Sequence, residues 1–393
     1  MPWEKRTVER QRIEFVEEVL RGELSKSELC RRYGISRKTG DKWLNRSKAG
    51  ETLADRSHAP FNSPNKTLPE IEEAVLAKRR KHPAWGPRKL HRALEREGEI
   101  KAPAPSTIAD ILKRNGYISI EASQAAKPYK RFQKASSNEM WQVDFKGHFA
   151  MQDGNRCHPL TMIDDCSRFS LCVDAKENER RDGVTESFTR VFLTYGLPDA
   201  LLGDNGNPWG SSQSTGYTLF EIWLMDLGIL PIHGRPFHPQ TQGKEERFNK
   251  TLVAEVLKIF DIINMQDAQM RFDAFRDCYN NERPHEALGL DVPADHYTPS
   301  IRAFPSKIRE WAYPSCFVMR KIKSSGYITY GNQGYYLSES FGGYTLGVRE
   351  SRIDGCINIY YRQFRIARID LREKAIISRK IYRADGDDVG GEY

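Results

Sequence analysis

The sequence has no apolar run approaching the roughly 20 residues that a membrane-spanning helix needs, which excludes a protein with helical membrane spans. Its first residues, Met1-Pro-Trp-Glu-Lys-Arg, lack the apolar core of a secretory signal, so we expect a cytoplasmic protein. The seven cysteines include no Cys-x-x-Cys pair. Their odd number and wide spacing predict reduced thiols, and argue against a disulfide framework or a zinc site.

Negative charge is scarce at both ends of the chain. Residues 1–140 carry 30 lysines and arginines against 19 acidic residues, and residues 301–393 carry 16 against 10. Residues 141–300 carry 15 against 24, so the net charge of +8 hides an acidic centre. This pattern fits metal-binding carboxylates between segments that grip DNA, and solvated surface charge is the alternative explanation. A length of 393 residues predicts two to four domains.

Residues 8–46 have the pattern of a helix-turn-helix. Ser27 is placed to cap a short helix, and Gly34-Ile35-Ser36 forms a turn in which glycine adopts the left-handed conformation. A second helix, from Arg37 to about Arg46, would bury Trp43 and Leu44. Recognition helices contact bases with their N-terminal residues, which favours DNA binding over a generic helical bundle. The DNA-contact residues expected here are Arg37, Lys38, Thr39 and Lys42.

A second helical unit follows a polar linker over residues 47–66. We expect helices over 68–81 and 87–97, and a third, capped by Ser106, over 107–115. Arg88 and Lys89 give this unit a basic surface, so it is predicted to be a second helix-turn-helix that binds DNA. A spacer bundle is nearly as good an interpretation. Residues 118–139 form a basic connector, expected to lie along DNA or to order only when DNA binds.

From Met140 the pattern changes to alternating strands and helices. An Asp153-Gly154 hairpin signal separates the first strands, and helices alternate with short apolar strands beyond Leu171. Strands are expected over 141–145, 159–163, 171–174, 198–203 and 229–236, and helices over 182–195, 219–227, 244–260 and 266–281. Residues 315–372 read as six short strands with glycine-rich turns, which suggest a small barrel.

Three carboxylates stand in distinct local settings. Asp144 lies within the strand Trp141-Gln-Val-Asp-Phe, where aspartate is disfavoured without a purpose. Asp204 ends an apolar run before Asn205-Gly206, which is also a strong turn signal by itself. Glu246 lies in the first turn of a helix. Carboxylates from two strands and a helix make an oxygen-rich site for hard cations such as Mg2+. Two such ions clamp the attacking and leaving oxygens of a phosphoryl transfer.

Two sequence motifs accompany these carboxylates: His238-Pro-Gln-Thr-Gln-Gly-Lys and Asn281-Glu-Arg-Pro-His-Glu-Ala-Leu. With them, residues 5–372 resemble the DDE transposases of bacterial insertion sequences, which are relatives of the retroviral integrases. The resemblance implies an α+β multidomain protein: N-terminal helix-turn-helix units, a ribonuclease-H-like α/β catalytic core and a C-terminal small β-barrel that binds DNA. The expected boundaries are 1–50 and 66–117 for the helical units, 118–139 for the linker, 140–300 for the core, 312–375 for the barrel and 384–393 for a disordered tail.

The family word Gly-Lys-x-Glu-Arg-Phe places the catalytic glutamate at Glu246. Helical geometry agrees, because Glu245 lies three residues before the apolar Phe248 and so faces the core. A slip of one residue would exchange the two roles. Asp164 and Asp165 compete for the role of Asp144, and we assign them instead to hydrogen bonds with Ser167 and Arg168 at a hairpin end.

Further residues have weaker assignments. Arg247 and Lys250 are DNA-contact candidates, or ordinary charges on a solvated helix. His238 could approach the scissile phosphate, and a turn histidine bonded to backbone is the preferred interpretation. Residues 207–217 lengthen the loop after Asp204 beyond the family pattern, and such insertions cost little.

The resulting hypothesis is a transposase that binds the terminal inverted repeats of its element, cleaves the 3′ ends and joins them to target DNA. Asp144, Asp204 and Glu246 would hold two Mg2+ ions, with Mn2+ as a substitute. The partners would be double-stranded DNA and further copies of the chain, at least a dimer, at the bacterial nucleoid, with no membrane. A domesticated DNA-binding regulator is the alternative, and a plain nuclease of the same fold would not need the flanking units.

Overall fold

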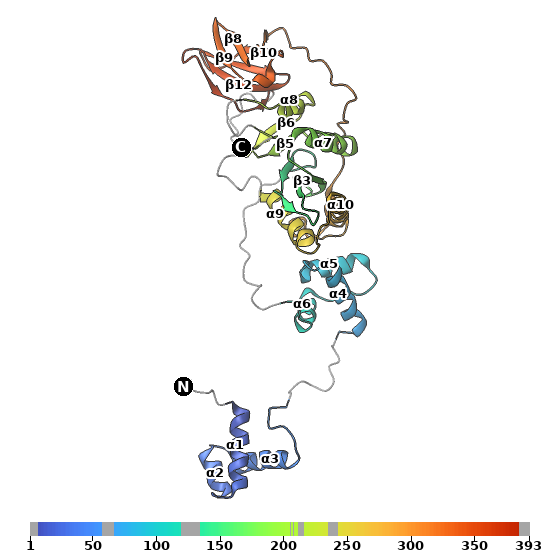
Figure 1. Cartoon of the computed structure of the whole chain (residues 1–393), viewed down its shortest axis with the longest axis vertical. Coiled ribbons are helices and arrows are strands. Elements are labelled where there is room, and N and C mark those ends of the chain that lie inside the picture. The colour runs from blue at the N-terminus through green and yellow to red at the C-terminus, as the bar shows by residue number, and fades with distance from the viewer. Residues whose placement is uncertain are drawn as a thin grey trace. The chain divides into compact units, whose positions relative to one another are not determined.

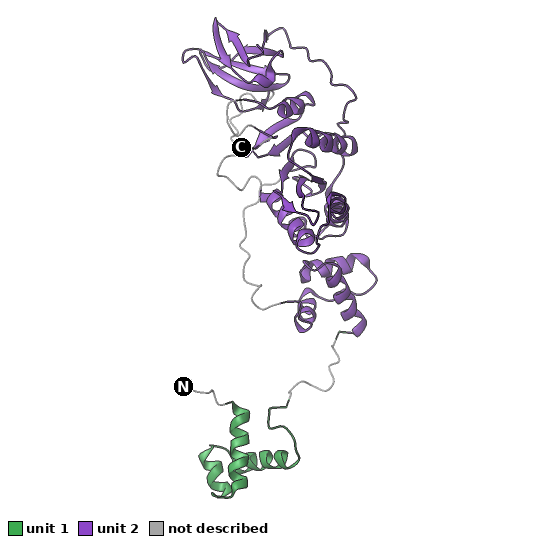
Figure 2. Cartoon of the chain, viewed as in Figure 1, with its two compact units in different colours: residues 1–67 green, residues 68–393 purple. Residues whose placement is uncertain are grey.

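The computed structural model describes residues 7–56, 67–118, 134–204, 206, 208–210, 216–234 and 243–384. The chain divides into two compact units, residues 1–67 and 68–393 (Figure 2). Figure 1 labels their elements in chain order. Within the described ranges, no helix is both long enough and apolar enough to cross a membrane. The predictions for most of the 118–139 connector, for His238 and for the tail from residue 385 lie outside these ranges.

The first unit is the expected helix-turn-helix, with helices α1 (Val8–Arg21), α2 (Lys26–Arg32) and α3 (Arg37–Lys48). The cap of α2 was predicted wrongly: Ser25, not Ser27, accepts from the Glu28 amide, and the Glu28 side chain returns to the Ser25 backbone. This reciprocal pair satisfies two helix-end amides at once. Gly34 has the left-handed φ of +65° that the turn requires, and Trp43 and Leu44 are buried as predicted.

The second unit begins with a helical bundle of α4 (Pro69–Lys81), α5 (Pro87–Glu97) and α6 (Pro105–Arg114). Each helix has proline in its first turn, where no backbone N–H is needed. Ser106 is therefore not a cap but lies inside α6. The bundle has its own apolar core around Trp85, Leu90 and Ile108, all fully buried.

The central sheet has the order β2-β3-β1-β5-β6, with β4 beside β3. Its strands are β1 (Trp141–Phe145), β2 (Phe149–Ala150), β3 (Arg156–Asp164), β4 (Ser170–Lys176), β5 (Ala200–Gly203) and β6 (Leu230–His233). The β1–β3 and β3–β4 pairs are antiparallel, and the β1–β5 and β5–β6 pairs are parallel. Helices α7 (Arg181–Tyr195), α8 (Leu219–Asp226), α9 (Gly243–Leu252) and α10 (Met265–Asn281) complete this part. The predicted ribonuclease-H-like arrangement is confirmed.

The two faces of this sheet bury separate apolar clusters. Trp141 and Val143 belong to the cluster that contains α7 and α8, and Ile163 and Val173 to the cluster that contains α9 and α10. The predicted single helix over 244–260 is wrong in its second half, because α9 passes into a π-helical turn at Val253–Leu257. Such turns are rare and concentrate near functional sites.

The C-terminal part has the six strands predicted over residues 315–372, β7 to β12, and two further strands beyond that range. They are β7 (Val318–Lys321), β8 (Tyr327–Tyr330), β9 (Gln333–Tyr336), β10 (Thr345–Glu350), β11 (Cys356–Tyr361), β12 (Phe364–Asp370), β13 (Ala375–Ser378) and β14 (Tyr382–Arg383). An antiparallel sheet runs β13-β12-β11-β10-β7, with β14 on β12, and β8 and β9 form a separate hairpin. The domain predicted as a small β-barrel is confirmed as a C-terminal all-β domain, and its described strands form an antiparallel sheet and a separate hairpin.

This C-terminal domain shares an apolar core with the ribonuclease-H-like part. Tyr217, Ile222 and Met225, at and before α8, lie in the same buried cluster as Ile359 and Phe364 of the C-terminal sheet. The Tyr217 hydroxyl donates to the Ile366 carbonyl. The loop extension noted in the sequence therefore ends in a structural anchor.

Candidate active site

Sheet register explains why two of the predicted carboxylates meet. The parallel β1–β5 pairing sets Trp141 opposite Leu201 and Gln142 opposite Leu202. Two residues further along each strand come Asp144 and Asp204, so both aspartates emerge at the same level on neighbouring strands. Burial, and after it the negative charge of Asp204, raises the pKa of Asp144, as expected for carboxylates on neighbouring strands.

Asp144 is held in a largely desolvated position. Burial, followed by the charge of Asp204, raises the pKa of Asp144 to about 7. The Asn249 side-chain amide of α9 donates to Asp144 Oδ2 at 3.0 Å, and the Thr161 hydroxyl donates to the Asp144 backbone carbonyl at 3.1 Å. A buried carboxylate beside another one is costly when both are ionised, and a cation between them offsets that cost.

Asp204 is fixed through its backbone. His233 Nδ1 lies 3.0 Å from the Asp204 carbonyl, and His233 Nε2 lies 2.9 Å from Glu221 Oε1. The hydrogen bond and charge of Glu221 outweigh burial and raise the pKa of His233. The Gly206 amide donates to Asp204 Oδ1 at 2.9 Å, which is the turn that the sequence suggested. Asp204 is therefore both a turn residue and a neighbour of Asp144, and the two interpretations of the sequence are compatible.

Helix α9 presents two adjacent glutamates in opposite environments. Glu245 is 1% exposed, and neither of its carboxylate oxygens has a hydrogen-bond partner that meets standard geometry. Burial raises the pKa of Glu245 well above its usual value, and the nearby Asp144 charge adds to this. The Glu246 side chain is 59% exposed and forms an ion pair with Lys250 at 2.7 Å. The prediction that Glu245 faces the core and Glu246 the flank is confirmed.

The structure brings together Asp144 and Asp204, and leaves the Glu246 carboxylate with Lys250. Glu246 lies three residues before Asn249, so the two share a helix face, and Asn249 contacts Asp144. Glu245, four residues before Asn249, is on that side as well, so the fold alone does not choose between the glutamates.

Sequence reasoning missed Asn249, Thr161 and His233. Helical spacing could have found Asn249, since it lies one turn after Glu246. Thr161 stands opposite Asp144 in the antiparallel β1–β3 register, which the sequence does not specify. His233 stands opposite Gly203 in the β5–β6 pairing and becomes meaningful only with that register.

Asp164 and Asp165 have structural roles, as predicted. Asp164 accepts from the Ser167 amide and hydroxyl and from the Asn138 amide. Asp165 accepts from the Gln142 amide and pairs with Lys244, rather than with Arg168. Lys244 is the second residue of α9, so this pair holds the start of the helix that carries the two glutamates.

The predicted DNA-contact residues of the first unit lie at the start of α3. Arg37, Lys38 and Lys42 are exposed, and the Thr39 hydroxyl lies 2.9 Å from that of Ser36, the cap of the helix. The Lys42 ammonium also lies 4.8 Å from the centre of the Trp43 ring. The arrangement leaves an exposed basic surface on the recognition helix.

The other predicted DNA-contact residues differ in accessibility. Arg88 and Arg247 are exposed. Lys89 is turned toward the central part of the chain, and burial, followed by the charge of Arg283, lowers its pKa to about 8. Lys250 is exposed but forms an ion pair with Glu246.

Known families match successive parts of the chain. A helix-turn-helix domain matches residues 11–61 and a homeodomain-like domain residues 39–112. Two integrase core domain families match residues 134–239 and 227–293. The C-terminal domain of IS481 family transposases matches residues 318–377. The first integrase match contains Asp144 and Asp204, and the second contains both candidate glutamates.

Two related proteins match this chain over most of their own length. A Geobacillus stearothermophilus protein described as a transposase for insertion sequence element IS5376 is 22% identical, over 92% of this chain and 88% of its own. An uncharacterized 31.7 kDa protein of insertion element IS407 from Burkholderia multivorans is 26% identical, over 58% of this chain and 82% of its own.

Among solved structures, the catalytic core of HTLV-2 integrase with magnesium is 18% identical and has a TM-score of 0.32, over 42% of this chain and all of that one. A simian T-cell lymphotropic virus intasome bound to a PP2A regulatory subunit is 16% identical, with a TM-score of 0.36, over 74% of this chain and 96% of that one. Likenesses with TM-scores this low say nothing further about the chain.

Proposed function

Because this chain belongs to the insertion-sequence transposases, polynucleotidyl transferases with an integrase core, we propose that it cuts the 3′ ends of its element and joins them to target DNA. The observation that supports this chemistry is the pair Asp144 and Asp204 at the ends of adjacent parallel strands. Asp144, Asp204 and Glu246 are the proposed catalytic residues.

The donor set fits Mg2+. Two mutually repelling carboxylates on neighbouring strands supply hard oxygen ligands, and Glu246 on helix α9 would add a third. One or two such ions, with Mn2+ as a substitute, would make a nucleophile of water or of a 3′-OH and offset charge on the leaving oxygen.

The chain's own residues prepare this site. Asn249 donates to one oxygen of Asp144 and so orients this carboxylate. His233 fixes the backbone of Asp204. The Lys244–Asp165 pair anchors the first turn of α9 against the hairpin end, so the helix presents its glutamates at the mouth of the site. Preorganised ligands of this kind lower the cost of ordering the reacting groups.

The test uses Asp144→Asn and Asp204→Asn in the full chain. Each removes one charged oxygen ligand at nearly constant size, so we expect strand transfer to fall by at least about 1000-fold while binding to element ends persists. Labelled element ends, a supercoiled target plasmid and Mg2+ provide the assay. Asp273→Asn, on an exposed face of α10, is the matched control. Undiminished transfer by either site variant would refute the catalytic roles proposed for these aspartates. Absence of transfer by the unaltered protein, with binding to element ends intact, would favour a DNA-binding regulator of the same fold.

We assign recognition of the terminal inverted repeats to the helix-turn-helix units, and to α3 in particular. Arg37→Ala with Lys38→Ala should weaken binding to terminal repeats about tenfold or more, with a shallower dependence on salt. Glu23→Ala, another exposed charge in the first unit, serves as control. Equal loss on random and terminal DNA would assign these side chains to nonspecific grip instead.

Two element ends must react together, so we expect at least a dimer on DNA. Its substrates are double-stranded DNA, and the expected place of action is the bacterial cytoplasm, at the nucleoid. Arg88, Lys89, Arg247 and Lys250 remain candidates for contacts to the DNA backbone.

A further inference from the structure

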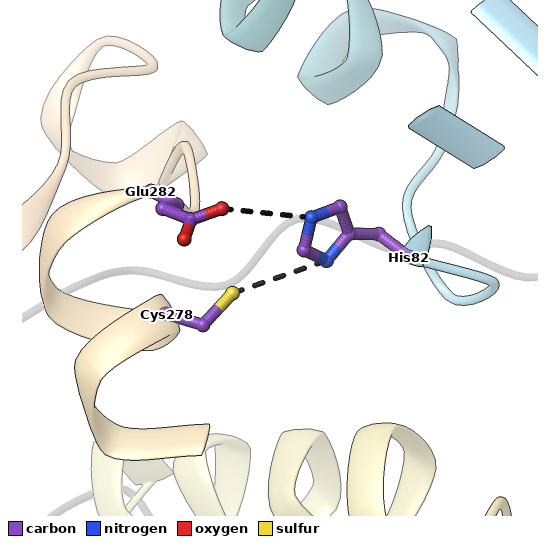
Figure 3. Close-up of side chains that lie close together, drawn as sticks. All are labelled: His82, Cys278 and Glu282. Atoms are coloured by element: carbon purple, nitrogen blue, oxygen red, sulfur yellow. Dashed lines mark hydrogen bonds and ion pairs between the residues drawn. The ribbon is translucent and has the colours of Figure 1, made fainter. Parts of the chain in front are cut away.

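A cluster of ligand-type side chains lies where the loop after α4 meets the end of α10. It consists of His82 from the loop and Cys278 and Glu282 from the helix end (Figure 3). In the part of the chain that the structure describes, this is the one group of three such residues whose ligand atoms all lie within 4.8 Å of one another. Nothing in the proposed transposition chemistry uses it.

The spacing of these atoms suits a shared ion. Cys278 and Glu282 are four residues apart, so they project from one side of the helix end. Cys278 Sγ lies 3.9 Å from His82 Nδ1, and Glu282 Oε2 lies 3.7 Å from His82 Nε2. The second distance is too long for a hydrogen bond. Only one ring nitrogen can bind a given ion, and one ligand atom from each of the three residues lies within 4.8 Å of the others. Ligand atoms around tetrahedral zinc lie roughly 3.3–3.7 Å apart, given bonds of about 2.0–2.3 Å, so binding would draw the three side chains slightly together.

An unsatisfied atom gives independent support. His82 is only 9% exposed, and its Nε2 is buried without a hydrogen-bond partner. Leaving such an atom unpaired costs about 1–3 kcal/mol, so it calls for an explanation. The ring also stacks on Trp85, with centroids 3.8 Å apart and planes 8° apart, which fixes its orientation toward α10.

We propose that His82, Cys278 and Glu282 form a zinc site that fastens the α4–α6 bundle to the catalytic part of the chain. Nitrogen, thiolate sulfur and carboxylate oxygen are ligands that zinc accepts together, whereas Mg2+ avoids sulfur. One ring nitrogen of His82 would bind, and water would complete the tetrahedron. Binding forms the zinc–sulfur bond and releases the Cys278 thiol proton to solvent.

A neighbouring lysine would compete with the ion for the carboxylate of Glu282. Lys81 Nζ lies 3.0 Å from Glu282 Oε2, so the ion must take this oxygen from Lys81. Lys78, which also faces His82, is paired with Glu97. Removing the Lys81 charge should therefore strengthen binding, and this is the opposite of what any ligand substitution should do.

A zinc ion here would add a salt-resistant link to the ion pairs that join the α4–α6 bundle to the catalytic part. Arg92 pairs with Asp291 at 3.0 Å and Arg96 with Asp295 at 2.5 Å across the same junction. Partly exposed ion pairs contribute little and weaken with salt. A coordinated ion would hold the bundle in place at salt concentrations that weaken these pairs.

Cobalt provides the test on the full-length protein, purified without metal. Co2+ bound by a thiolate absorbs in the near ultraviolet, and Asp144, Asp204 and Glu246 offer no sulfur. We expect this band to saturate at about one equivalent and to disappear when Zn2+ is added. Cys278→Ser should abolish it, and Cys316→Ser, which alters an exposed thiol elsewhere, should leave it unchanged.

Two further variants keep the test independent of folding defects. Glu282→Gln, which preserves the shape of the side chain, should weaken Co2+ binding at least about tenfold, and Lys81→Gln should strengthen it several-fold. Absence of the band in the unaltered protein would overturn the proposal. Its persistence in Cys278→Ser, or its loss in Cys316→Ser, would do so as well, because the sulfur ligand would then lie elsewhere.

Discussion

The strand residues and the helix residues of the candidate active site differ in how firmly their side chains are held in place. Asp144 and Asp204 are set by the β1–β5 register and by contacts from Asn249 and His233. Glu246 on α9 has an exposed side chain that pairs with Lys250, one turn away. Neighbouring strands fix the separation of their side chains through backbone hydrogen bonds, whereas an exposed helical side chain chooses among rotamers.

This contrast suggests an order of assembly. In the proposed site, the aspartates would form a half-site before DNA arrives, and Glu246 would join it by a side-chain movement. Separating the acidic groups in this way also limits the repulsion among them, since a third carboxylate beside Asp144 and Asp204 would raise the electrostatic cost further. The predictions below test the contrast in order of decreasing effect.

The largest effect should separate the two adjacent glutamates. Glu246→Gln should reduce strand transfer by at least about 1000-fold, because it removes a charged ligand, whereas Glu245→Gln should change it by less than about tenfold. Both proteins should bind element ends normally. The integration assay with Mg2+ measures the difference.

The reverse result would be equally informative. A dead Glu245→Gln protein and an active Glu246→Gln protein would mean that the buried glutamate turns to the aspartates when metal binds. The helix side would then be as preformed as the strand side, and the contrast between them would disappear.

A smaller loss of strand transfer is expected when the contact between Asn249 of helix α9 and Asp144 of strand β1 is removed. Asn249→Ala removes the donor to Asp144 Oδ2 and the acceptor of the Thr161 hydroxyl. Strand transfer should fall about 10- to 100-fold, and the Mg2+ concentration for half-maximal activity should rise, because the half-site loses its alignment. Asn281→Ala, on an exposed part of α10, is the control. An unchanged Mg2+ requirement would show that the sheet alone aligns Asp144.

The smallest effect concerns stability and pH. The pKa of Glu245 is raised in the folded chain, so its contribution to stability is fully present below the unfolded pKa and is lost as pH rises through the folded pKa. Glu245→Gln should therefore raise the Tm of the metal-free protein at pH 8 by roughly 2–4 °C, and by less at pH 5. Thermal melts at the two pH values measure this, and a gain independent of pH would show that ionisation of Glu245 is not its cause.

The sequence predicted much of this molecule, for identifiable reasons. Strand β1 and helix α5 were predicted at their observed bounds, since alternation and an N-terminal proline are strong local signals. Spacing to Phe248 correctly placed Glu245 inward and Glu246 outward. The pairing of Asp144 with Asp204 followed from the family resemblance, whereas its cause, a parallel register, is a long-range property.

Other features were beyond local patterns. The π-helical turn after Leu252 interrupts a periodicity that reads as one continuous helix. The metal-type cluster joins His82 to residues almost 200 positions later, so the spacing rules that argued against a zinc site could not detect it. The two short strands β13 and β14 lie beyond residue 372, where the predicted strand pattern ended.

The cluster shared by Tyr217, α8 and the C-terminal sheet bears on how such proteins exchange parts. A crossover that replaced residues 318–384 with those of a distant relative would leave Ile222 and Met225 against an unmatched surface. A crossover between residues 57 and 66 would fall at the boundary of two compact units, and the described residues of the first unit form an apolar cluster of their own. Recombination should therefore replace the N-terminal reader of DNA freely, while the catalytic and C-terminal parts are inherited together.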